Sequence, residues 1–250
     1  MNPPDFNLDK IKFSTDRRTL EKAFKLYEDG KVTQVKEGIR SYGGIVIGTH
    51  PYQVSVEARR YDYADCTCYL GQHDELCKHM VALAICVVKS GEPLTDEDKQ
   101  IYHHLVCSGQ LGGFSAGELK ETKNTITHCL CYIKPYNVPS RLWFSYQNSL
   151  SEGCNRLAKV VSELPVSKQT ADLLVNLMLR LDKKLTEGGV DDSDGTVGEF
   201  IEDLVGMMFE FVQLDSECIA SIEKLKNQNT CFDWEEPLLD LLETFPNAHK

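Results

Sequence analysis

Alternating apolar and polar side chains predict a small sheet in the first third of the chain. In residues 51–58 the odd and even positions differ consistently in polarity, which is typical of a half-exposed strand. Apolar runs predict two further strands at residues 32–39 and 42–48, and residues 48–51 supply a turn. The pattern therefore predicts three short strands that are adjacent in sequence.

Two helices accompany this sheet. Ser14, Thr15 and Asp16 can cap a helix that runs to about Glu28, shortly before a glycine. Residues 77–89 form the second predicted helix, and their apolar side chains cover most of its circumference. A helix of this kind is buried, so we expect it to pack on the sheet.

Beyond residue 90 the apolar spacing is helical. One leucine-rich stripe predicts a helix around residues 173–185, and a second apolar stripe predicts another around residues 200–212. Shorter helices are predicted at residues 95–106, 115–133, 140–163, 216–227 and 234–244. The sequence shows no clean repeat period, so it predicts an all-α bundle or a short helical array.

Charge separates the same two regions. Residues 1–90 contain 13 basic and 12 acidic side chains, whereas residues 91–250 contain 14 and 26. This change coincides with the turn-forming sequence Ser90-Gly-Glu-Pro93. We therefore predict an α+β chain with two domains, a small module of strands and helices in residues 1–90 and an acidic helical domain in residues 95–250.

Four metal-ligand side chains lie in two close pairs, Cys66-Thr-Cys68 and Cys77-Lys-His79. On an extended segment the two sulfurs of a C-x-C pair point to the same face. A C-x-H pair can do the same at the start of a helix, where the backbone has just left the extended region, so each pair can present both ligands to one ion. Zinc is usually held by four such sulfur and nitrogen donors in a tetrahedron. The order and spacing favour one zinc site over unrelated buried thiols, and we expect a reducing compartment because the chain shows no secretion signal.

This pattern resembles the SWIM-type zinc finger, which has C-x-C, a variable gap and C-x-H. The sequences Gly43-Gly-Ile-Val-Ile-Gly48 and Pro51-Tyr-Gln-Val-Ser-Val56 are similar to the two strands before the family's first cysteine. The run that begins at Cys77 is similar to its closing helix. The resemblance covers roughly residues 13–90 and implies that Cys66, Cys68, Cys77 and His79 hold one Zn²⁺.

The ligand set predicts a structural zinc rather than a catalytic one, because protein side chains fill all four positions. Three thiolates and a neutral imidazole give the site a net charge of about −1 with Zn²⁺ bound. We expect Lys78 and the first amides of the 77–89 helix to offset that charge. Cys86, further along this helix, is expected to be a buried free thiol.

Two other polar clusters favour ordinary structural roles. The sequence Asp191-Asp-Ser-Asp-Gly195 lacks the ligands that a calcium loop needs, so it predicts an Asx-rich turn that caps a helix near Thr196. Cys129 and Cys131 lie on a predicted helix, where side chains two apart point in different directions. Together with Cys154, they are expected to be core thiols rather than a second metal site.

The sequence contains no recognisable catalytic motif, so we expect a non-enzymatic protein. The favoured hypothesis is a protein-interaction adaptor or scaffold in the cytoplasm, or in the nucleus of a eukaryote. The alternative is weak nucleic-acid (DNA) binding through the SWIM-type finger, and a third hypothesis is a thiol redox sensor. No membrane span is predicted, and the sequence leaves the partner and the oligomeric state open.

The nucleic-acid alternative rests on cations interleaved with tyrosines, which suit phosphates and stacked bases. The tyrosines are Tyr42, Tyr61 and Tyr63. The cations are Arg17, Arg18, Lys22, Lys25, Lys31, Lys36, Arg40, Arg59 and Arg60. The module's net charge is only +1, and the acidic region would repel phosphate.

Overall fold

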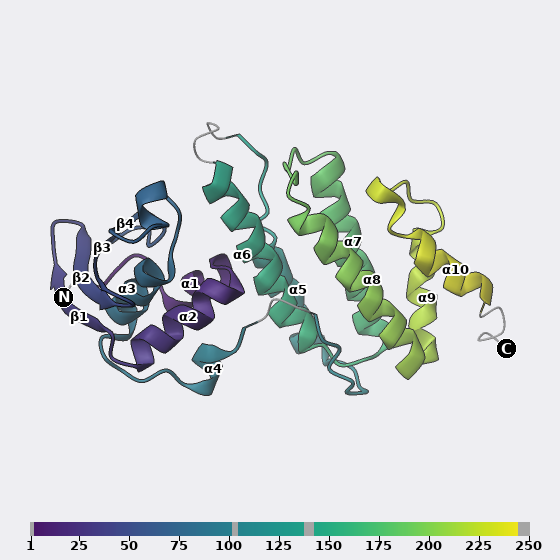
Figure 1. The fold of residues 1–250 in the computed structure, drawn as a ribbon. Helices are drawn as coiled ribbons and strands as arrows, with labels where there is room; N and C mark the ends of the chain where they lie inside the picture. The colour runs from purple at the N-terminus through teal and green to yellow at the C-terminus, as the bar shows by residue number, and fades with distance from the viewer. Residues whose placement is uncertain (1–2, 102–104, 138–142, 245–250) are drawn as a thin grey trace. The chain divides into compact units, whose positions relative to one another are not determined.

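A computed structural model describes residues 3–101, 105–137 and 143–244. The chain forms two compact units, Met1–Ile101 and Tyr102–Lys250 (Figure 1). The first unit contains a four-stranded antiparallel sheet with helices, and the second is mainly helical. The predicted α+β fold class is therefore confirmed.

The sheet of the first unit has the strand order β1-β2-β3-β4. Its strands are β1 (Val32–Glu37), β2 (Ser41–Ile47), β3 (Pro51–Glu57) and β4 (Ala64–Cys66). The first three correspond to the predicted strands, and β4 is an addition that the sequence did not indicate. Because Val54 of β3 pairs with Cys66 of β4, this fourth strand fixes the first cysteine of the C-x-C pair against the sheet.

Three longer helices complete the unit: α1 (Leu8–Ser14), α2 (Arg17–Glu28) and α3 (Lys78–Lys89). Helix α3 contacts both α2 and the sheet, and eight of its twelve side chains are buried, which confirms the predicted packing. Asp16 caps α2 by accepting a hydrogen bond from the amide of Thr19. Helix α1 was not predicted, and the side chain of Asn7 caps it.

The predicted helix at residues 95–106 is wrong. Helix α4 spans only Asp96–Lys99, and residues 105–106 are not helical; residues 102–104 lie outside the described part of the chain. The residues of α4 are held by the first unit. Lys12 donates to the carbonyl of Glu97, and Lys89 pairs with Asp98 at 2.8 Å. The observed division between the units therefore falls after Ile101, rather than at residues 90–93.

The second unit is built on four long helices and a group of short ones. The long helices are α5 (Ala116–Cys129), α6 (Trp143–Ser162), α7 (Lys168–Thr186) and α8 (Thr196–Leu214). The predicted helix at 216–227 is a chain of short turns: η3 (Ser216–Cys218), α9 (Ile219–Ile222) and η4 (Glu223–Leu225). After η5 (Cys231–Asp233), helix α10 spans Glu236–Thr244. Residues 140–142 of the predicted 140–163 helix lie outside the described residues.

The cores of the two units are separate sets of buried side chains. The core of the first unit includes Tyr42, Leu83 and the three cysteines of the metal pattern. The core of the second unit is formed by apolar faces of α5 to α10. Within the described residues, none of the helices has the length and apolar character that crossing a membrane requires.

Candidate metal centre

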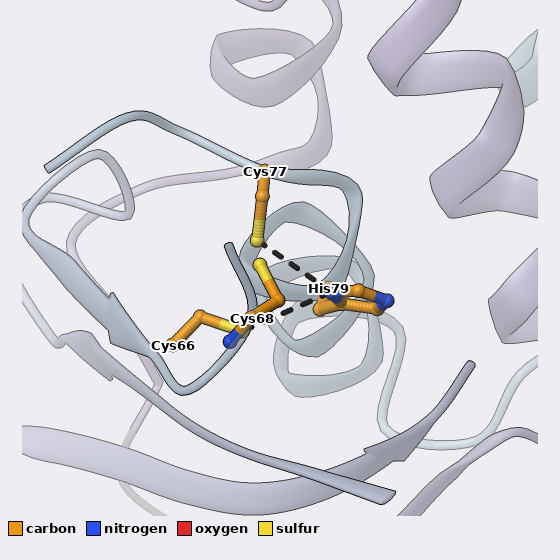
Figure 2. A group of neighbouring side chains, drawn as sticks. All are labelled: Cys66, Cys68, Cys77 and His79. Carbon is orange, nitrogen blue, oxygen red and sulfur yellow. Dashed lines mark hydrogen bonds between the residues drawn. The ribbon is translucent and has the colours of Figure 1, made fainter. Parts of the chain in front are cut away.

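The structure brings Cys66, Cys68, Cys77 and His79 together (Figure 2). Cys66 ends β4, and Cys68 lies just past it. Cys77 is the N-cap of α3, and His79 lies in the first turn of that helix. All four side chains are buried, with exposed fractions between 1% and 7%. A sheet edge and a helix N-terminus therefore supply one ligand pair each.

The ligand atoms of these residues all lie within 4.8 Å of one another. His79 directs its Nδ1 atom toward the sulfurs, at 3.8 Å from Cys66 Sγ and 3.7 Å from Cys77 Sγ. Tetrahedral zinc with ordinary bond lengths separates nitrogen and sulfur by about 3.6 Å, and two sulfurs by about 3.8 Å. The two nitrogen–sulfur distances are therefore close to those of a tetrahedral site, and the group as a whole is consistent with one metal ion.

Backbone amides donate to each of the three sulfurs. The amide of Cys68 lies 3.4 Å from Cys66 Sγ, and the amide of Gly71 lies 3.4 Å from Cys68 Sγ. The amide of Met80, in the first turn of α3, donates to the Cys77 side chain. Amides aimed at sulfur stabilise thiolates, because they offset negative charge in a buried place. The predicted donation from the start of α3 is thus present, and Lys78 lies partly exposed beside it.

Hydrogen bonding between Cys66 and Cys77 shifts the pKa values of the two thiols in opposite directions. A hydrogen bond from the Cys66 thiol lowers the pKa of Cys77 to about 4, and His79 and the Met80 amide act in the same direction. The same hydrogen bond, together with burial, raises the pKa of Cys66. A bound metal deprotonates its thiol ligands, so metal binding here must release protons.

The imidazole of His79 is held by packing. The Tyr52 ring stacks on it with centroids 4.4 Å apart and an interplanar angle of 29°. The second ring nitrogen, Nε2, is buried without a hydrogen-bond partner among the described residues. A Cβ atom at Gly48 would lie 2.9 Å from this Nε2 atom. The turn between β2 and β3 therefore leaves room for the ring only because residue 48 is glycine.

Gly71 gives a direct test of how tightly the loop between Cys68 and Cys77 packs against Cys66. A Cβ atom at this position would lie 2.3 Å from the carbonyl oxygen of Cys66 and 2.6 Å from its Cβ atom. Gly71→Ala should therefore displace the backbone that carries Cys66 and Cys68. We expect at least a tenfold loss of zinc affinity, measured by competition with a chromogenic chelator.

Gly206→Ala is the matched control, because a Cβ atom there meets nothing within 4 Å. Position 206 lies inside α8, where alanine is favoured over glycine by about 1 kcal/mol. This variant should keep the zinc affinity of the parent chain. Equal zinc affinity in the Gly71→Ala and Gly206→Ala variants would show that the loop is not sterically constrained.

The remaining sequence candidates do not form a second centre. Asp192 accepts hydrogen bonds from the amides of Val197 and Gly198 at 2.8 Å, so it caps α8 as the Asx-turn interpretation predicted. Cys129 and Cys154 are buried, but Cys131 is exposed, contrary to its prediction as a core thiol. In the described part of the chain, no other group of three or more His, Cys, Asp or Glu side chains is placed to hold a metal.

Cys86 is only partly buried, and the sequence had predicted a buried thiol. It lines a cavity of about 520 Å³ between α2, α3 and the segment that follows α3. Cys86 lies seven positions after His79 along α3 and is not part of the metal-ligand group.

The three tyrosines of the nucleic-acid hypothesis differ in their exposure to solvent. Tyr42 and Tyr61 are only 2% and 1% exposed, so they cannot stack on bases. Tyr63 is 45% exposed, and the Arg60 guanidinium lies 4.5 Å from its ring centroid. The burial of two of the three aromatic side chains removes most of the proposed stacking surface.

Comparisons of the chain with protein-family models, with curated proteins and with solved structures find no match. What the chain can do is therefore inferred from its own residues and geometry.

Proposed function

We propose that the first unit is a SWIM-type module with one structural zinc, and that the chain is a non-enzymatic adaptor that binds another protein. The observation that carries the metal assignment is the buried group of Cys66, Cys68, Cys77 and His79, with all ligand atoms within 4.8 Å. Three sulfurs and an imidazole are donors that zinc accepts readily. The order of the ligands along the chain matches the family's C-x-C and C-x-H pairs.

The structural role follows from the closed ligand set. Four protein donors leave no position for water or substrate, and catalytic zinc sites keep such a position open. The buried sulfurs also argue against a thiol redox sensor, because sensor cysteines are accessible to oxidant. The zinc would instead link β4 to α3 and hold together a small core.

Protein binding is favoured by the charge of the chain. The net charge is −11, and the whole excess of acidic side chains lies beyond residue 90. A nucleic acid would be repelled by this field, whereas a basic protein would be attracted. The adaptor hypothesis therefore fits the composition better than a dedicated nucleic-acid binder does.

Nucleic-acid binding is the second candidate, and one feature of α2 favours it. Arg18, Lys22 and Lys25 follow one another at helical spacing, and all three are exposed. Such a stripe can contact successive phosphates, in a manner that depends strongly on salt. Fluorescence anisotropy with labelled DNA and RNA at two salt concentrations distinguishes this candidate from the adaptor.

Elemental analysis of the full chain, purified without chelator, tests the metal assignment. We expect one zinc per chain, and loss of the metal in a Cys66→Ser/Cys77→Ser variant, because two of the four donors are removed. Cys131→Ser is the matched control, since Cys131 is exposed and outside the metal group, and it should keep the zinc. A folded parent chain without zinc, or zinc retained by the double variant, would refute the assignment.

A further inference from the structure

The segment between the two ligand pairs, Tyr69–Leu76, exposes apolar side chains; we name it the metal loop. Tyr69 is 74% exposed and Leu70 is 39% exposed. Single exposed apolar residues are common on protein surfaces. Here two exposed apolar residues are adjacent in sequence, and they follow directly after Cys68, one of the four candidate metal ligands. Such a placement is typical of an interaction site.

Hydrogen bonds within the metal loop hold it in one shape. The carbonyl of Leu70 accepts the amides of His73 and Glu75, both at 3.0 Å. His73 also contacts Tyr69, through a 2.7 Å bond between its Nδ1 atom and the Tyr69 carbonyl and through ring centroids 4.3 Å apart. The exposed tyrosine is therefore fixed before any partner arrives. A preorganised surface loses less conformational entropy on binding than a flexible one.

The charge around the metal loop is negative. Between Tyr61 and Cys77 the sequence contains four acidic residues and neither lysine nor arginine, and one of the four, Asp62, pairs with Arg60 at 2.5 Å. Two of these acids, Asp74 and Glu75, lie in the metal loop and are exposed. Neither forms an ion pair with the cations that the structure describes. Lys78 compensates one charge, but the metal site itself adds about −1 with zinc bound.

We propose that the metal loop is a docking surface for a basic segment of another protein, with an apolar side chain of that segment packed against Tyr69 and Leu70. This inference rests on the proposed zinc module and names its partner. An aromatic anchor with flanking opposite charges is the usual form of such a contact, because the anchor supplies affinity and the charges supply orientation. The same charges disfavour nucleic acid at this surface, and they disfavour the acidic region of a second copy.

Selection from a random 12-residue peptide library displayed on phage tests the proposal without assuming a sequence. The target is the full zinc-loaded chain. Selected peptides should be rich in lysine and arginine and should contain at least one large apolar residue. A selection that yields no binding peptide, or yields peptides without a positive net charge, would overturn the proposal.

Variants then locate the binding surface. By fluorescence anisotropy, Tyr69→Ala should weaken a labelled selected peptide at least tenfold, because the anchor is removed. Asp74→Asn/Glu75→Gln should weaken it several-fold and reduce its dependence on salt. Ile39→Ala and Glu202→Lys are controls, since both residues are exposed outside the metal loop, and neither should change the affinity. Equal affinity across all four variants would also overturn the proposal.

Zinc content, measured on the same samples, separates this inference from the proposed function. If the parent chain contains zinc but the selected peptides bind equally well to the metal-loop variants, the docking surface alone is refuted. A folded parent chain without zinc would refute the proposed zinc module, and it would also refute the docking surface that rests on that module. If the Tyr69→Ala variant loses zinc, the Asp74→Asn/Glu75→Gln variant tests whether the metal loop binds the peptide, because it keeps Tyr69 and all four metal ligands.

Discussion

Removal of the metal with a chelator is expected to unfold residues 1–101 and to leave the helices of the second unit folded. Cys66, Cys68 and Cys77 belong to the core of the first unit, so loss of the ion takes away contacts at the centre of that unit. Structural zinc contributes about 10–16 kcal/mol of apparent binding free energy in small zinc-finger peptides. A domain of about 100 residues has a net stability of only about 5–15 kcal/mol, so the contribution of the metal would be of comparable size.

Hydrogen exchange along the intact chain, with and without chelator, measures this effect. We expect amides of β2, β3 and α3 to lose protection, while α7 and α8 keep theirs. The buried side chains of α7 and α8 belong to a different core cluster, which contains none of the proposed metal ligands. Equal loss of protection in both units would show that they fold as one cooperative body.

The metal group was accessible from sequence because its geometry is local. Two ligands that are two residues apart on extended backbone share a face, whichever sheet they later join. In the structure only the first member of each pair has extended backbone: Cys66 ends β4 and Cys77 is the N-cap of α3, whereas Cys68 lies in the bend after β4 and His79 lies in α3. Only one long-range contact had to be inferred, the meeting of the two pairs, and the turn-forming residues between them made that inference safe.

Features that depend on distant partners were missed. Strand β4 has three residues, too few to show alternation, and it exists because Val54 and Val56 of β3 offer a partner. The first compact unit extends past the charge change at residues 90–93, through contacts such as that of Lys12 with Glu97, which the sequence cannot show. Composition marks where charge changes, whereas the unit boundary is set by contacts between residues far apart in sequence.

Side-chain burial was the other weak point. Tyr42 and Tyr61 lie among cations in the sequence, and this pattern suggested an exposed aromatic surface. In the structure, the hydroxyl of Tyr61 bonds to Thr15 at 2.9 Å inside the core. A tyrosine can be buried when its hydroxyl has a partner, and that partner is 46 residues away. The cationic stripe on α2 remains exposed, so the phosphate-binding alternative keeps its charges but loses most of its stacking residues.

The second prediction concerns the stability of the acidic helical unit, and it is based on the buried carboxylate of Asp182 on α7. Its Oδ1 atom accepts hydrogen bonds from the Cys231 amide at 2.8 Å and from Trp234 Nε1 at 3.0 Å, which tie η5 to α7. Asp182→Ala would leave both donors without their acceptor. Since each unsatisfied buried group costs about 1–3 kcal/mol, we expect a loss of roughly 2–5 kcal/mol in the unfolding free energy of the second unit.

Asp182→Asn separates the role of the acceptor from that of the side chain's bulk. An asparagine retains an Oδ1 acceptor for both donors, but without the charge that strengthens them, so its cost should be about half that of alanine. Asp172→Ala removes an exposed ion pair with Lys224 and should cost at most about 1 kcal/mol. Urea denaturation followed by circular dichroism gives these values, and elemental analysis should find one zinc in every variant. The described hydrogen bonds of the Asp182 carboxylate all lie within the helical unit, so Asp182→Ala should destabilise that unit alone. Loss of zinc in the Asp182→Ala variant would therefore contradict the independence of the two units.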